Sequence, residues 1–152
     1  MNLFFDTSAL VKLYHKETGT DNVLKSLRRH EDDLSIIITD ISIIECHSAL
    51  MKHVRTGDMK LEKARTALTL LEHEIEMFHL VEVDMIAKEF ARQLVNQISH
   101  QRNLGTLDAM QLATAILYHQ IIAIDYFVAC DKRLLNFAMQ YFKTFNPEIE
   151  EI

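Results

Sequence analysis

Short runs of apolar residues recur along the chain, and their lengths fit β-strands better than longer elements. The first run, at residues 2–5, ends at Asp6, and the second, at residues 34–38, is rich in β-branched side chains. The pattern predicts strands at residues 2–5, 34–38, 80–83 and 126–130, with an edge strand within residues 141–145.

The segments between these runs have the spacing of amphipathic helices, with apolar residues recurring every three or four positions. They predict helices over residues 8–18, 20–30, 40–54, 59–78, 85–100, 106–118 and 131–140. Several begin at residues suited to capping, among them Thr39 or Asp40, Asp58, and Asp84. Strands that alternate with helices predict an α/β fold, in which a parallel sheet is covered by helices on both faces.

The helices expected at 20–30 and 59–78 carry more apolar surface than one face of a small sheet can cover. Their apolar residues are Val23, Leu24 and Leu27 in the first, and Leu61, Ala64, Leu68, Leu71 and Ile75 in the second. We expect the surplus to bind a partner chain or a second copy of the protein.

The composition narrows the class of protein. The 152 residues are 49% apolar and 25% charged, with 3 glycines and 1 proline, which excludes a disordered or collagen-like chain. The length suits one domain, residues 1–152, and no apolar run approaches the roughly 18 residues of a membrane-spanning helix. The start does not resemble a signal peptide, and Cys46 and Cys130 are too few for a disulfide framework. We therefore expect a soluble, cytoplasmic protein that is not associated with a membrane.

The formal net charge of -6 argues against a broad basic surface for nucleic acid, because it repels a polyanion at long range. A local basic rim or a bound metal ion would still allow such a partner to bind. Lys12, Lys132 and Arg133 are candidates for phosphate contacts, although a solvated role is the default expectation for each.

Four acids occupy places where open parallel sheets bind ligands, beyond the carboxyl ends of the strands. Asp6 directly follows the first predicted strand, and Asp131 follows the fourth. Asp108 lies in the first turn of the helix expected at 106–118. Glu45 lies about one turn into the helix after the second strand, in a segment that is apolar on most sides.

Helix capping explains each aspartate taken alone, because a carboxylate at a helix start accepts backbone N–H bonds. Glu45 is harder to explain in this way, since a carboxylate on a buried helix face needs a cation, a donor or a metal ion. Gathered at one sheet edge, the acids would repel one another by about 4 kcal/mol per pair at ~4 Å and an effective dielectric near 20. No basic partner is evident among them, so we expect a cation. Oxygen ligands without clustered His or Cys favour Mg²⁺ or Mn²⁺ over zinc.

Four segments carry these acids along the chain. They are Phe4-Phe5-Asp6-Thr7-Ser8-Ala9-Leu10, residues 41–50 around Glu45, Leu107-Asp108-Ala109-Met110-Gln111-Leu112-Ala113-Thr114-Ala115, and Phe127-Val128-Ala129-Cys130-Asp131-Lys132-Arg133-Leu134. In order and spacing they resemble the motifs of PIN-domain nucleases, and they are most similar to the VapC-like toxins of bacterial toxin–antitoxin pairs. The resemblance spans residues 4–134.

The resemblance implies a three-layer α/β/α sandwich and metal-dependent hydrolysis of RNA phosphodiester bonds. The four acids of the family match Asp6, Glu45, Asp108 and Asp131. The three aspartates are then the expected Mg²⁺ or Mn²⁺ ligands, directly or through water, and Glu45 is a further ligand or orients the attacking water. The resemblance also implies an RNA substrate, an antitoxin protein as partner, and a homodimer.

One position departs from the family pattern. Ala129 stands two residues before Asp131, where the family often has Ser or Thr, so a hydroxyl is missing from the edge of the expected site. Thr7 and Ser8 are expected to cap the first helix, with the alternative that either hydroxyl holds a metal-bound water.

Two other functions remain open. A catalytically silent PIN-like module would keep the fold for RNA or protein contacts, but the presence of all four acids favours an enzyme. An Asp that ends the first strand is also typical of aspartyl-phosphate phosphatases. Those enzymes need a second Asp two positions later, where this chain has Ser8.

Overall fold

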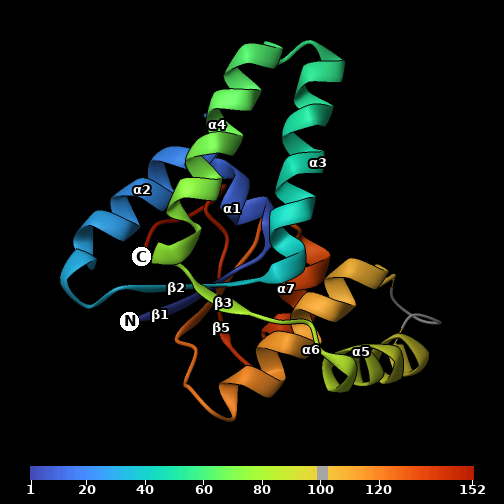
Figure 1. The fold of residues 1–152 in the computed structure, drawn as a ribbon. Helices are drawn as coiled ribbons and strands as arrows, with labels where there is room; N and C mark the ends of the chain where they lie inside the picture. The colour runs from blue at the N-terminus through green and yellow to red at the C-terminus, as the bar shows by residue number, and fades with distance from the viewer. Residues whose placement is uncertain (99–102) are drawn as a thin grey trace.

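The computed structural model describes residues 1–98 and 103–152 and has a five-stranded parallel sheet between two layers of helices (Figure 1). The strands are β1 (Asn2–Phe5), β2 (Ser35–Thr39), β3 (His79–Val81), β4 (Tyr126–Val128) and β5 (Lys143–Phe145). The α-helices are α1 (Thr7–Tyr14), α2 (Thr20–Arg29), α3 (Asp40–Thr56), α4 (Leu61–Glu74), α5 (Met85–Ile98), α6 (Thr106–His119) and α7 (Lys132–Ala138), with 3₁₀ helices at Glu31–Asp33 and Ile75–Met77. The predicted α/β/α sandwich is confirmed.

The order of the strands places a crevice at the centre of the sheet. The sheet runs β3-β2-β1-β4-β5, so the chain adds β2 and β3 on one side of β1 and then crosses over to add β4 and β5 on the other. Such a reversal point opens a ligand-binding crevice at the carboxyl ends of the two strands that flank it. Here these strands are β1 and β4, and the Asp6 N–H donates to the Val128 carbonyl at 2.9 Å.

Alternating side chains divide the core into two halves, one on each face of the sheet. On β1, Leu3 and Phe5 pack with α1 to α4, whereas Phe4 packs with α5, α6 and α7. On β2, Ile38 and Ile37 divide in the same way. These strands are apolar on both faces, as a parallel sheet covered by two helix layers requires.

The helix expected at 59–78 is shorter than predicted, and Asp58 does not cap it. Asp58 belongs to the turn that ends α3: its N–H donates to the His53 carbonyl, and its carboxylate accepts from the Thr56 hydroxyl at 2.5 Å. Gly57 makes this turn with φ +85°, a conformation that favours glycine. α4 therefore starts only at Leu61 and packs antiparallel to α3, and the pair extends beyond the sheet in Figure 1.

The first helix also ends earlier than the predicted residue 18, because His15 already has extended backbone angles. The Thr20 hydroxyl accepts from the Glu17 N–H and donates to the His15 carbonyl, which fixes the following loop. In that loop Gly19 has φ +89°, and an added Cβ would lie 2.8 Å from the Pro147 carbonyl oxygen. α5 is described as far as Ile98, so the last two residues predicted for that helix, 99 and 100, lie outside the described residues.

Most of the apolar surface expected to remain on α2 and α4 is packed instead. Val23, Ala64, Leu68 and Leu71 are buried, although Leu61 remains 43% exposed. Large exposed apolar side chains occur on other elements, among them Met85 and Ile86 on α5 and Ile121 after α6. In the described part of the chain, none of the helices combines the length and apolarity needed to cross a bilayer.

Candidate active site

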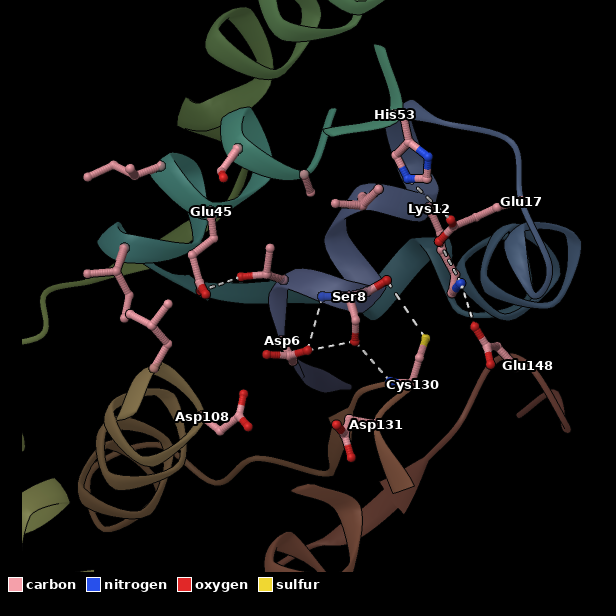
Figure 2. Close-up of a pocket in the computed structure, with 17 residues that line it drawn as sticks. Asp6, Ser8, Lys12, Glu17, Glu45, His53, Asp108, Cys130, Asp131 and Glu148 are labelled. Atoms are coloured by element: carbon pink, nitrogen blue, oxygen red, sulfur yellow. Dashed lines mark hydrogen bonds and ion pairs between the residues drawn. The ribbon is translucent and has the colours of Figure 1, made fainter. Parts of the chain in front are cut away.

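The four predicted acids line one cleft of about 720 Å³ at the carboxyl edge of the sheet (Figure 2). Asp6 follows β1, and Asp131 lies three residues beyond the end of β4. Asp108 is the third residue of α6, and Glu45 lies in the second turn of α3. Four elements separated along the chain thus bring their carboxylates to the crevice between β1 and β4.

Asp6 is the most buried of the four acids, with 6% of its surface exposed. One carboxylate oxygen caps α1, accepting from the Ser8 N–H at 3.0 Å and the Ser8 hydroxyl at 2.6 Å. Burial raises the pKa of Asp6 to about 6 against the lowering effect of these bonds, and the charges of Asp108 and Glu45 raise it further. Capping and membership of an acidic cluster therefore apply to the same residue.

Ser8 also connects the start of α1 to the loop after β4. Its hydroxyl accepts from the Cys130 N–H at 2.9 Å while donating to Asp6. The expected capping role is thus met by the Asp6 carboxylate, and the Ser8 hydroxyl holds that carboxylate in place.

Glu45 is oriented by two neutral side chains beneath the cleft. Its Oε2 accepts from the Thr7 hydroxyl at 2.7 Å and from the Gln111 side-chain amide at 2.5 Å. The same amide nitrogen lies 2.9 Å from the Thr7 hydroxyl oxygen, so the three side chains form a closed set. The side-chain carbonyl oxygen of Gln111 accepts from the Ser42 hydroxyl at 3.4 Å. The Ser42 hydroxyl in turn lies 2.8 Å from that of Thr39. Glu45 therefore has the hydrogen-bond donors that its apolar helix face requires.

Gln111 was not predicted to contribute to the site. It is 1% exposed and stands between Met110 and Leu112 on a strongly apolar helix. A lone amide residue within such a helix was the available signal, because a buried amide needs partners for both its donor and its acceptor.

Asp108 and Asp131 differ in their electrostatic surroundings. Burial and the Asp131 charge raise the pKa of Asp108, against a backbone hydrogen bond from Gly105. Asp131 caps α7 and also binds the Arg133 guanidinium, with Nη2 3.1 Å from Oδ2, so the pKa of Asp131 is lowered. The expectation that the cluster has no basic partner is wrong at this one position.

Two further expectations about neighbouring residues need correction. Lys12 is not solvated: it is 2% exposed, and its ammonium group donates to Glu17, Glu148 and the Thr18 carbonyl. Ala129 is fully buried in the core that faces α5 to α7 and does not line the cleft.

Comparisons with known proteins agree with this geometry. The PIN domain family matches residues 3–138. A comparison with curated protein sequences gave no match. Among solved structures, the chain is similar to one in VapBC2 from Rickettsia felis bound to a promoter DNA fragment, with TM-score 0.70, 14% identity, and coverage of 96% of this chain and 98% of that one.

Two other solved structures show the same likeness. FitAcB from Neisseria gonorrhoeae gives TM-score 0.68 and 16% identity over 97% of this chain and 99% of that one. VapC20 from Mycobacterium tuberculosis is a Sarcin-Ricin loop cleaving toxin. It gives TM-score 0.63 and 16% identity over 89% of this chain and 94% of that one. Identities this low show a shared fold. The match of the family itself covers most of the chain, and on that ground the chain belongs to the PIN domain family.

Proposed function

We propose that the protein is a metal-dependent endoribonuclease and the toxin of a toxin–antitoxin pair. The observation that carries this proposal is the convergence of Asp6, Glu45, Asp108 and Asp131 on one cleft, in a chain of the PIN domain family. Structural similarity to chains from VapBC2 and FitAcB, and to the toxin VapC20, supports the toxin assignment.

The residues of the cleft fit a hard divalent cation. The raised pKa values of Asp6 and Asp108 show that burial and mutual repulsion disfavour their charged forms, which a cation would stabilise. The atoms that the four acids offer to a metal ion are carboxylate oxygens, the ligands that Mg²⁺ and Mn²⁺ prefer. Asp6, Asp108 and Asp131 would hold the ion, with Glu45 as a further ligand. A bound ion would activate water and neutralise charge on the phosphate.

The protein side chains supply orientation. Thr7 and Gln111 fix the Oε2 of Glu45, and Oε1, which has no hydrogen-bond donor among the described residues, would accept a proton from a water in the cleft. Ser8 fixes one oxygen of Asp6 in the same way and leaves the other open. Because these groups are already held in the folded protein, little reorganisation is needed when a substrate binds.

RNA is the proposed substrate class, although the net charge is -6. Lys132 and Arg133 are exposed at the start of α7, next to Asp131, which lines the cleft, and from there they would form a small basic rim for a bound RNA. Phosphate contacts by such a rim, together with a bound cation, would offset the long-range repulsion. Lys12 is not part of this rim, because its ammonium group is buried.

The test is cleavage of RNA by purified protein with Mg²⁺ or Mn²⁺. We expect Asp6→Asn, Glu45→Gln, Asp108→Asn and Asp131→Asn each to lower the rate by about 100-fold or more, the scale of single catalytic groups. The matched control is Asp84→Asn, since Asp84 caps α5 through the Ala87 N–H and does not line the cleft. Circular dichroism would check that each variant folds.

The outcomes separate this proposal from its alternative. Cleavage that survives in folded acid variants would show that the assigned site is wrong. If the wild-type protein binds RNA or a partner without cleaving it at any metal concentration, the protein is a catalytically silent PIN-like module. Mapping new 5′ ends in cellular RNA after expression of wild type and Asp108→Asn would identify the substrate.

A further inference from the structure

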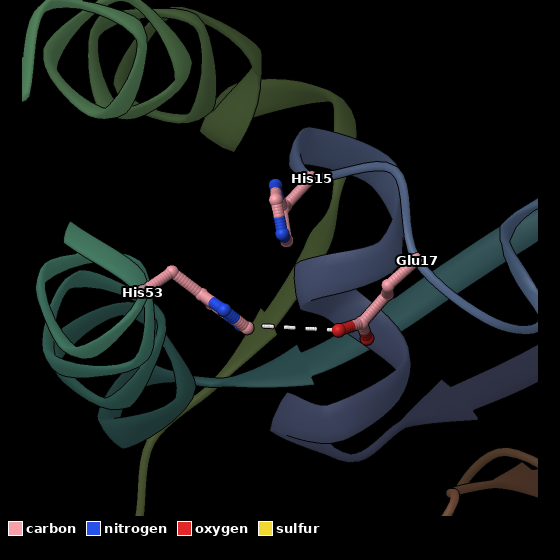
Figure 3. Close-up of side chains that lie close together, drawn as sticks. All are labelled: His15, Glu17 and His53. Atoms are coloured by element: carbon pink, nitrogen blue, oxygen red, sulfur yellow. Dashed lines mark ion pairs between the residues drawn. The ribbon is translucent and has the colours of Figure 1, made fainter. Parts of the chain in front are cut away.

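A second group of metal-binding side chains lies at the opposite end of the cleft from the four acids. It consists of His15, Glu17 and His53, whose potential ligand atoms all lie within 4.8 Å of one another (Figure 3). Glu17 and His53 line the cleft that also holds the four acids. We propose that His15, Glu17 and His53 form a binding site for a transition-metal ion of the zinc type, separate from the Mg²⁺ or Mn²⁺ site proposed above.

The ligand atoms are close to the positions that such an ion requires. The Nε2 of His53 is 3.8 Å from the Oε2 of Glu17, and the two imidazole rings are 4.4 Å apart at their centroids. Ligand atoms around tetrahedral zinc are about 3.4 Å apart, as follows from bonds of about 2.0–2.1 Å. Small side-chain rotations would close this difference, and all three side chains are only half-buried.

The nitrogen atoms of the two rings are available to a metal ion. Within residues 1–98 and 103–152, neither ring nitrogen of His53 has a partner closer than the carboxylate oxygens of Asp58 and Glu17, at 3.7 and 3.8 Å, and His15 contacts the His53 ring rather than a polar group. The other half of Glu17 is already fixed, since its Oε1 accepts from Lys12 at 2.7 Å. This leaves the Oε2 of Glu17 as the ligand atom. Lys12, by binding Oε1, holds the Glu17 carboxylate in position, as residues behind metal ligands commonly do.

The electrostatic surroundings also favour a cation. His15 directly follows the last residue of α1, and His53 lies in the last turn of α3. The carboxyl ends of helices carry partial negative charge, so both helices attract a positive ion to this point. Asp58 adds a carboxylate 3.7 Å from the Nδ1 of His53. The buried Lys12 neutralises only part of this negative charge.

The type of ligand distinguishes this site from the acid cluster. Two imidazoles and one carboxylate suit zinc, nickel or cobalt, whereas the carboxylates at the other end suit Mg²⁺ or Mn²⁺. Three protein ligands leave a fourth position open to water or another small ligand. The inference does not depend on nuclease activity, and it can be tested without it.

The experiment is calorimetric titration of chelator-treated protein, free of any affinity tag, with Zn²⁺ in the presence of excess Mg²⁺. Co²⁺ serves as a second probe, because its absorption spectrum reports imidazole coordination. We expect one equivalent of Zn²⁺ to bind, and His15→Gln and His53→Gln each to weaken it at least about tenfold, since even loss of a supporting residue typically costs that much. Mg²⁺ alone should not displace Zn²⁺.

Two matched controls locate the ion. His47→Gln changes another histidine of α3, which lies 3.7 Å from Glu72 and outside the cluster, and should bind Zn²⁺ as the wild type does. Asp6→Asn should also retain the Zn²⁺ site. If Zn²⁺ binding is absent from the wild type, or is lost in Asp6→Asn but kept in both histidine variants, the proposal is wrong. His15 and His53 lie on different helices, so the two variants test the site independently if one fails to fold.

Discussion

The carboxyl group of Asp6 is placed where its charged form is disfavoured. It is almost fully buried, and the neighbouring charges that act on it, those of Asp108 and Glu45, are also negative. Among residues 1–98 and 103–152, Ser8 offsets this effect through two hydrogen bonds. A residue kept in such a position at the expense of stability is typical of a functional site.

The raised pKa of Asp6 predicts a specific dependence of stability on pH. Because its pKa is about 6 in the folded state against 3.8 ordinarily, the folded protein binds the proton more tightly. The free energy of unfolding contributed by Asp6 therefore falls as pH rises from about 4 to above 6, by at most about 3 kcal/mol. Asp6→Asn should remove this loss and be more stable than wild type at pH 7.5 without metal.

Urea unfolding of both proteins in a chelator, from pH 5 to pH 8, measures this difference. The gap in stability between Asp6→Asn and wild type should widen with pH and shrink when Mg²⁺ is added, because the ion stabilises only the charged carboxylate. Asp84→Asn controls for the general effect of an Asp to Asn change. Parallel pH profiles for wild type and Asp6→Asn would contradict the argument.

Gln111 is expected to act on the reaction through Glu45. Gln111→Met has a similar volume but leaves Oε2 of Glu45 with only the Thr7 hydroxyl as donor. We expect RNA cleavage at saturating metal to fall about 10- to 100-fold, less than in Glu45→Gln, because loss of a residue that orients a metal-binding side chain has effects of that size. The measurement is kcat, with KM for RNA little changed. Gln97→Met, at an exposed position of α5, is the control, and an unchanged kcat in Gln111→Met would remove Gln111 from the site.

The sequence predicted the residues at strand ends and missed those whose partners are distant in the chain. Asp6, Glu45 and Asp131 could be found because the apolar runs locate the carboxyl ends of strands, whereas Asp108 was found from its place in the first turn of a predicted helix and in a PIN-like motif. Lys12 was misjudged because one of its partners, Glu148, is 136 residues away. Gln111 was missed because Thr7 and Glu45 become its neighbours only once the helices pack on the sheet.

At the scale of elements, type and order were predicted better than boundaries. The five strands were expected within a few residues of their positions, and the edge strand at residues 141–145 is β5. The main error, at residues 58–60, arose because Asp58 fits equally well before a helix and within the turn that ends one. The periodic pattern does not show which neighbour the carboxylate binds, and here it binds Thr56.

The exposed apolar side chains of β3, α5 and the end of α6 suggest how a homodimer would form. Met85, Ile86 and Ile121 are 76%, 67% and 81% exposed. Ile86 and Ile121 border a hollow of about 280 Å³, and β3 is an edge strand beside it. We predict that the double variant Ile86→Asp with Ile121→Asp is monomeric, whereas wild type is dimeric, because charge in an apolar interface is costly.

Light scattering during size-exclusion chromatography measures this difference directly. Ile149→Asp is the control, since Ile149 is 69% exposed but lies in the tail beyond β5. A dimeric double variant would place the interface elsewhere, and a monomeric wild type would exclude the homodimer.

At the scale of the whole molecule, charge is distributed unevenly around the cleft. The net charge is -6, and the four acids gather at one edge of the sheet with Arg133 as the basic side chain bound to one of them, Asp131. The other three acids accept hydrogen bonds from neutral groups among the described residues. The cleft therefore attracts cations, and a basic segment of a partner protein has the same attraction as a metal ion.

We predict that a partner which inhibits the protein places an arginine beside Asp6, Asp108 and Glu45. Arginine stays charged at any working pH and binds carboxylates through two parallel hydrogen bonds. Asp131 is a poorer target because Arg133 already occupies it.

Since the inhibitor and Mg²⁺ would then compete for the same carboxylates, raising Mg²⁺ should weaken binding of the partner at constant ionic strength. Asp6→Asn should weaken it as well, whereas Asp84→Asn should not. Titration of the co-purified partner against each protein measures these effects, and an affinity that is indifferent to both Mg²⁺ and Asp6→Asn would mean that the partner blocks RNA at another surface.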